Sequence, residues 1–157
     1  MKNYLSILLT LFLVFSSLSL KAAGSLEMQV EKTITRALNS YNKAITDNDP
    51  DYWLRYFNKD ITFSSPLKTS KNIDDLKNYY SLEFSNFDAN YETEQVIAKG
   101  RTAAAKIVWN IKKKSDANFS KISIAAFFEL SPSGKFSSAS FYFDTQDHVT
   151  LFKEMLK

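Results

Sequence analysis

The sequence predicts a single α+β domain that follows a short leader segment. Up to Asp88, apolar residues recur every three or four positions, which is typical of helices with one buried face. After Asp88 they recur at every second position through four segments joined by short turns, which indicates an antiparallel sheet. Because the helices precede the strands rather than alternating with them, the α+β class is favoured over the α/β class.

Residues 1–24 have the organisation of a secretory signal peptide. A lysine stands near the start, residues 7–15 form an apolar run, and the small residues Ala22 and Gly24 follow. We therefore predict cleavage after Gly24 or Ala22, and a periplasmic or secreted mature protein of residues 25–157. The alternative is an uncleaved membrane anchor. Four serines and a threonine interrupt the apolar stretch, whereas a span needs about 20 predominantly apolar residues. No membrane association is expected after cleavage.

Composition argues against several classes of function. Loss of Lys2 and Lys21 with the leader leaves 18 basic residues against 17 acidic ones, so the formal charge falls from +3 to +1. A nearly neutral domain without a wide basic stripe is a poor candidate for binding nucleic acid. There is no cysteine, hence no disulfide framework and no lipid-anchoring cysteine. With His148 as the sole histidine, we expect no metal site and no cofactor.

The helical half divides into three helices. The first should cover residues 26–47, and Asp49 and Pro50 fit the N-cap and first turn of a short second helix. A strand is expected at residues 61–63, after which Asn72 can cap the third helix. The expected buried residues of the three helices are, in order, Val30, Ile34, Leu38, Tyr41 and Ile45; Trp53, Leu54 and Phe57; and Ile73, Leu76, Tyr80, Phe84 and Phe87.

The second half should form an antiparallel meander. The expected strands are residues 91–98, 102–112, 119–130 and 135–143. Gly100 and Gly134 lie in two of the turns, and the alternation places Trp109 on the buried face. Asp144 or Thr145 can cap a final helix. Its expected apolar residues are Val149, Leu151, Phe152 and Leu156.

The order of these elements resembles the nuclear transport factor 2-like superfamily, in particular its SnoaL-like and ketosteroid isomerase-like members. Local similarity is carried by the segments 41–49, 53–57, 60–66 and 134–144. The resemblance covers nearly all of residues 27–155 and makes residues 25–157 one SnoaL-like domain. It implies a cone-shaped curved antiparallel sheet with three N-terminal helices and a short C-terminal helix. It also implies a conical cavity closed by the first helix, and in many members a homodimer formed through the outer face of the sheet.

The resemblance also implies where catalytic residues would stand, and several of them are missing. Tyr41 matches the first-helix tyrosine of ketosteroid isomerases, but Ser65 occupies the position of their base and Ala126 that of their oxyanion donor. Neither residue can perform that chemistry. In epoxide hydrolase-like relatives an aspartate activates water where this chain has Phe141, and scytalone dehydratase-like chemistry needs two histidines. We therefore expect no enzyme of these types.

Two polar candidates remain. Asp144 could be a general acid or base if it is buried, although an N-cap role is favoured. Tyr41 could either orient a ligand carbonyl or satisfy a hydrogen bond in the core. The aromatic content, 13 Phe, 8 Tyr and 2 Trp, suits an apolar ligand, although core packing is the favoured interpretation. The candidate ligand-binding residues are Tyr41, Trp53, Phe63, Ser65, Trp109, Phe128, Phe141 and Phe143.

The sequence thus predicts an exported domain that binds a small apolar ligand without the catalytic residues of its relatives. Two alternatives stay open. The domain could be a non-catalytic module for dimerisation or interaction, or a lyase or isomerase that uses Asp144 and Tyr41.

Overall fold

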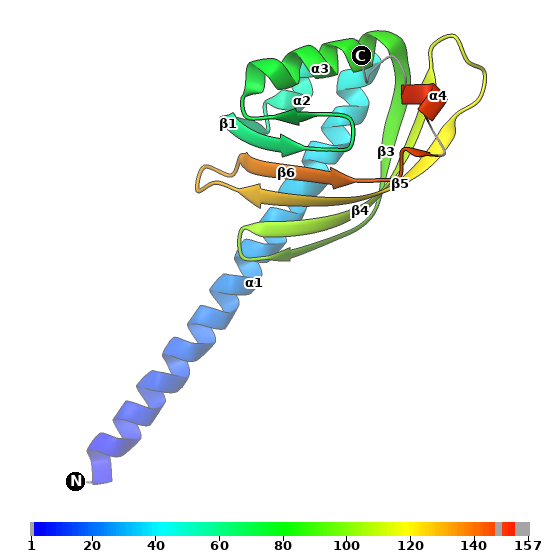
Figure 1. Ribbon diagram of the computed structural model, residues 1–157. Coiled ribbons are helices and arrows are strands. Elements are labelled where there is room, and N and C mark those ends of the chain that lie inside the picture. The colour runs from blue at the N-terminus through cyan, green and yellow to red at the C-terminus, as the bar shows by residue number, and fades with distance from the viewer. Residues whose placement is uncertain (1, 147–148, 153–157) are drawn as a thin grey trace.

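The computed structural model describes the backbone of residues 2–146 and 149–152, and the side chains of residues 24–146, 151 and 152. Helix α1 (Lys2–Asp47) is a single helix whose second half packs on the domain and whose first half projects from it (Figure 1). It starts well before the expected residue 26, since residues 2–25 include many helix-forming residues and no proline. Its predicted end is confirmed: Asn48 follows with a left-handed backbone (φ 55°), a common helix terminator.

The next two helices begin where their capping residues predict. Asp49 accepts a hydrogen bond from the Asp51 amide at the start of α2 (Pro50–Leu54), and Asn72 accepts one from the Asp75 amide at the start of α3 (Ile73–Asn86). Two residues assigned to helix stripes belong to strands instead. Phe57 opens β1 (Phe57–Ser64), and Phe87 opens β3 (Phe87–Lys99); both side chains are buried as expected.

Six strands form one sheet in the order β2-β1-β6-β5-β4-β3. The four long meander strands are confirmed as β3, β4 (Thr102–Lys113), β5 (Ser120–Leu130) and β6 (Phe136–Tyr142). Two features were not predicted: the short strand β2 (Thr69–Ser70), and the parallel pairing of β1 with β6. Breaks in pairing register occur in β3 between Thr93 and Gln95, and in β6 at Ser137, opposite Glu129 and Leu130 of β5. Such bulges help to curve a sheet.

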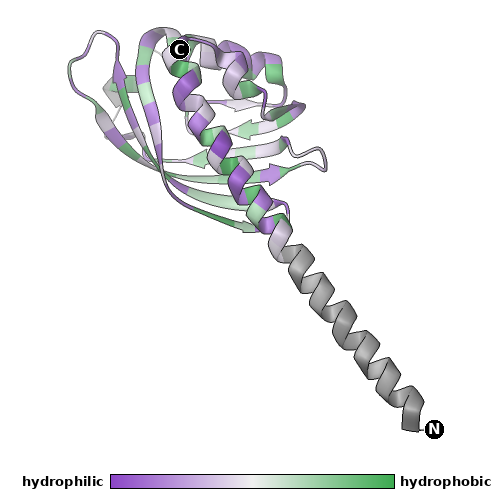
Figure 2. Ribbon diagram, turned by 180° about the vertical axis from the view of Figure 1, so that it is seen from behind, coloured by the Kyte–Doolittle hydropathy of each residue, from purple (hydrophilic) through white to green (hydrophobic). Residues whose placement is uncertain are grey.

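The curved sheet and the helices enclose one core, so the predicted α+β class with a cone-shaped sheet is confirmed. Helix α1 runs across one face of the sheet, which we call the inner face (Figure 2), and α3 lies next to α2 and β1 (Figure 1). Along β4 and β5 every second side chain points to the inner face, including Trp109 and Ile124, as the alternation predicts.

A short C-terminal helix, α4 (Val149–Phe152), lies beside the sheet, near β3 and β5 (Figure 1). Phe152 is fully buried, and its ring stacks on Trp109 with 5.6 Å between ring centroids. The predicted helix residue Leu156 and the single histidine, His148, lie outside the described residues. Within the part of the chain that is described, no helix has the length and apolar character required to cross a membrane.

Candidate functional site

A buried carboxylate, Glu83 on α3, lies at the centre of the inner core. Glu83 is only 1% exposed to solvent. The Tyr41 hydroxyl of α1 donates a hydrogen bond to Glu83 Oε1 (2.5 Å), and Trp109 Nε1 of β4 donates to the Tyr41 oxygen (3.1 Å). A second phenol, Tyr79, also hydrogen bonds to the carboxylate. Three elements that are distant in sequence therefore meet at this single acidic group.

The sequence analysis missed Glu83, although a signal was present. Glu83 stands three residues after Tyr80 and seven after Leu76, so it lies on the apolar stripe of α3. A charged residue on the buried stripe of a helix is uncommon unless it has a partner or a function. The expected stripe of α3 includes Tyr80 and Phe84 and omits the acidic residue that lies between them.

Burial controls the protonation of this site. It raises the pKa of Glu83 to about 7, although hydrogen bonds from Tyr41 and Tyr79 act in the opposite direction. Burial, and then the proximity of Glu83, raise the pKa of Tyr41 and of Tyr79 far above the ordinary tyrosine range. Near neutral pH, Glu83 therefore exchanges a proton while the phenols stay neutral hydrogen-bond donors.

A small cavity adjoins Glu83 between α3 and the inner face of the sheet. Its volume is about 10 Å³, room for a single water molecule. It is lined by Phe63, Ser65, Tyr79, Tyr80, Glu83, Tyr91, Trp109, Ile124, Phe141 and Phe143. Ser65, Tyr79 and Phe143 are half-buried, whereas the other lining residues are buried, so the first three mark the mouth. Aromatic rings thus fill most of the expected conical cavity.

Five of the eight candidate ligand-binding residues line this cavity: Phe63, Ser65, Trp109, Phe141 and Phe143. The other three lie behind the lining. Tyr41 stacks on Tyr91 with 4.0 Å between ring centroids, and Phe128 packs edge-on against Phe141. Trp53 packs edge-on against Tyr41, and its indole N–H has no hydrogen-bond partner among the described residues.

Asp144 and the lining residue Ser65 make local structural contacts. Asp144 is exposed and accepts a hydrogen bond from the Gln146 amide (2.8 Å), which is the capping type of contact rather than a buried acid. Ser65 Oγ accepts from the amides of Leu67 (3.2 Å) and Lys68 (3.0 Å) and so holds the turn between β1 and β2. Among the described residues, no group of three or more acidic or histidine side chains could hold a metal ion.

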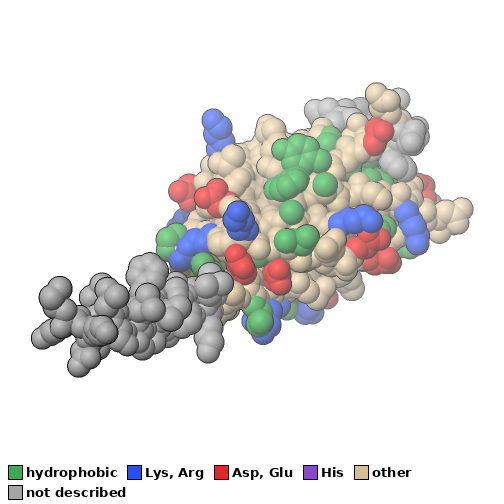
Figure 3. All heavy atoms as spheres, turned by 90° about the horizontal axis from the view of Figure 1, so that it is seen from below, with side chains coloured by type: hydrophobic (Ala, Val, Ile, Leu, Met, Phe, Trp, Pro, Cys, Tyr) green, Lys and Arg blue, Asp and Glu red, His purple; other side chains and the backbone are tan. Residues whose placement is uncertain are grey.

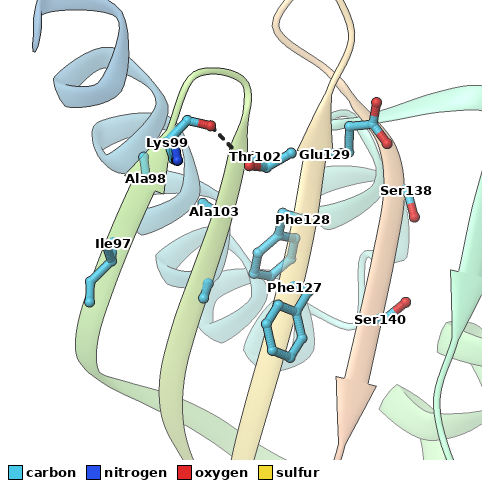
Figure 4. A pocket seen from close by; sticks show the side chains of 11 residues that line it. Ile97, Ala98, Lys99, Thr102, Ala103, Phe127, Phe128, Glu129, Ser138 and Ser140 are labelled. Carbon is cyan, nitrogen blue, oxygen red and sulfur yellow. Dashed lines mark hydrogen bonds between the residues drawn. The ribbon is translucent and has the colours of Figure 1, made fainter.

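The opposite, outer face of the sheet carries a shallow groove of about 490 Å³. Figure 4 shows its side chains, which come from β3, β4, β5 and β6 and include Ile97 and Phe127. Phe127 and the neighbouring Tyr142 are 52% and 58% exposed, with their rings 5.8 Å apart. Seen from below the sheet, hydrophobic side chains gather in the middle with charged ones around them (Figure 3).

The family model of the SnoaL-like domain matches residues 38–139, the stretch that contains Tyr41, Glu83 and the sheet. The chain belongs to the SnoaL-like domain family. A search of curated proteins found no match.

Several solved structures are similar to this SnoaL-like domain. One is the pinacolase BvnE from Penicillium brevicompactum, which is 13% identical and has a TM-score of 0.68; the similarity covers 83% of this chain and 95% of that chain. An LEH-like epoxide hydrolase from Mycobacterium tuberculosis has 14% identity, 83% and 91% coverage, and a TM-score of 0.62.

A de novo designed protein with a curved sheet is about as similar to this SnoaL-like domain, with 12% identity, 82% and 94% coverage, and a TM-score of 0.60. Two proteins named as enzymes and one designed protein therefore share this backbone arrangement. Identities at this level establish the fold alone, and function depends on the side chains that each member carries on it.

Proposed function

We propose that this SnoaL-like domain is exported and binds a small, mainly apolar molecule in the inner cavity, without catalysis by the residues its relatives use. The observation that supports the proposal best is the chemistry of the lining, in which aromatic rings surround the single carboxyl group of Glu83. Ligand sites are commonly apolar and aromatic with a few polar groups that orient the ligand. The non-catalytic part of the proposal rests on Ser65, Ala126 and Phe141, which stand where acid–base residues would be needed.

A ligand larger than water requires the mouth to open. One ring at the mouth, that of Phe143, lies 5.7 Å from Trp109 and 6.0 Å from Phe152, and Phe152 in turn stacks on Trp109. Phe143 and Phe152 both belong to the chain segment after β6, which ends in the short helix α4. Movement of one phenyl ring would free a space suited to a benzene-sized group. We therefore place the entrance between Phe143 and Tyr79.

Two experiments test binding. Native mass spectrometry of protein purified from its own host should find a co-purified small molecule. The neutral fluorescent probe N-phenyl-1-naphthylamine should bind the purified protein, and Ile124→Trp, which fills the cavity, should abolish that binding. Ser123→Trp is the matched control, because it adds the same ring to the same strand on the exposed outer face. Equal probe binding by both variants, with unchanged circular dichroism, would contradict the proposed site.

A second candidate function is dimerisation or interaction through the outer face. It is favoured by the exposed pair of Phe127 and Tyr142, because adjacent exposed aromatic rings often mark interaction surfaces. Size-exclusion chromatography with light scattering should give a dimer mass, which the double variant Phe127→Ser/Tyr142→Ser should reduce to a monomer. A monomeric wild-type protein at high concentration would remove this candidate.

A further inference from the structure

Glu83 is buried without a positively charged partner. None of the described residues that line the inner cavity is Lys, Arg or His, and no ion pair of the described residues involves Glu83. Its partners are phenols, which stabilise a carboxylate but leave its charge uncompensated. By contrast, Asp75 and Glu94, which are far more exposed, each pair with a lysine. Burying a charge without a counter-charge is costly.

The surrounding groups also favour positive charge. Aromatic rings carry partial negative charge on their faces and attract organic cations, and the tryptophan face is the most effective. Trp109, Tyr79, Tyr80 and Tyr91 all line the cavity with Glu83. The only other polar lining residue, Ser65, uses its hydroxyl oxygen within the turn after β1. An anion would meet no charged donor in this lining.

We propose that the ligand of the inner cavity is a small organic cation, an amine with a hydrocarbon body, whose nitrogen pairs with Glu83 while its carbon groups contact the aromatic rings. This inference rests on the proposed function, because it names the class of ligand that the same cavity takes. The cation supplies the counter-charge that the described protein groups do not supply, and it holds Glu83 in the ionised form. Binding near neutral pH therefore releases the Glu83 proton.

No other described group facing Glu83 changes charge between pH 5 and 8. The carboxyl faces Tyr41 from α1, Tyr79 and Tyr80 from its own helix, and Tyr91 from β3. Burial raises the pKa of all four phenols far above this interval. A change of cation affinity across neutral pH would therefore report the ionisation of Glu83.

The test compares a cation with its uncharged counterpart on the full chain. The probes are 4-fluorobenzylammonium and 4-fluorobenzyl alcohol, followed by fluorine NMR line broadening. At about pH 8 the cation should bind roughly tenfold more tightly than the alcohol, and the preference should disappear near pH 5.5, where Glu83 is protonated. Glu83→Gln should abolish the preference at both pH values. The matched control Glu94→Gln removes a carboxylate on the outer face and should leave the preference intact.

Calorimetry in two buffers of different ionisation enthalpy gives a second measurement that needs no variant. The wild-type protein should release a proton near pH 7 when the ammonium probe binds, and none when the alcohol binds. Equal binding of both probes, unaffected by Glu83→Gln, would overturn this inference and leave the cavity as an apolar site. Binding of neither probe, nor of the neutral naphthylamine, would overturn the proposed function together with it.

Discussion

Replacing Glu83 by glutamine should change how the stability of the protein depends on pH. Glutamine has nearly the same shape and can still accept the Tyr41 hydrogen bond, but it does not ionise. The carboxyl has a pKa of about 7 in the folded protein against 4.5 in an exposed chain. The folded state therefore binds more protons than the unfolded state between these values, and stability falls as the pH rises through this interval.

The expected magnitude follows from the two pKa values. At about 1.4 kcal/mol per pH unit, the interval between 4.5 and about 7 corresponds to about 3 kcal/mol. Glu83 contributes no penalty below pH 4.5 and the whole penalty above pH 7. Between pH 4 and pH 8, the free energy of unfolding of the wild type should therefore fall by about 3 kcal/mol more than that of Glu83→Gln. This difference corresponds to roughly 6–12 °C in melting temperature.

Urea unfolding of both proteins at half-unit steps of pH measures this difference. Other titrating groups cancel because they are common to both proteins. Asp75 is an example: its hydrogen bond from Lys68 lowers its pKa and so acts in the opposite direction. Glu94→Gln is the control, since that carboxylate is partly exposed and paired with Lys106. Two curves for wild type and Glu83→Gln that stay parallel across the whole pH range would refute the reasoning.

Three further predictions concern the fold and the leader. Trp109→Ala should lower the free energy of unfolding by about 3–5 kcal/mol, because it leaves a large void beside the inner cavity. As a control, replacement of the exposed Lys121 by alanine should change it by no more than about 0.5 kcal/mol. Equal shifts of the urea midpoints for the two variants would contradict the assigned faces of the sheet. Asp144→Asn should leave binding of the naphthylamine probe unchanged, and a loss of binding would restore Asp144 as a site residue. N-terminal sequencing of exported protein should start at Ala23 or Ser25, and a stable membrane-bound form with an intact N-terminus would disprove cleavage.

The sequence alone determined the elements that depend on local interactions. Asp49 and Asn72 cap helices through contacts that span two or three residues, so the sequence was sufficient to predict where α2 and α3 begin. The two-residue alternation through Trp109 and Ile124 correctly assigned the inner face of β4 and β5. Together with the resemblance to SnoaL-like domains, these local signals were enough for the fold class.

Only the tertiary structure decided what lies at the centre of the domain. Tyr41 is 42 residues from Glu83 and 68 from Trp109, so their hydrogen bonds exist only once α1, α3 and the curved sheet are packed together. The parallel pairing of β1 with β6 and the filling of the cone by aromatic rings depend on the same packing. Periodicity can indicate that a side chain is buried, but it carries no information about which distant side chain it meets. For that reason Glu83 was visible in the sequence as a charged residue on an apolar stripe, and its environment was not.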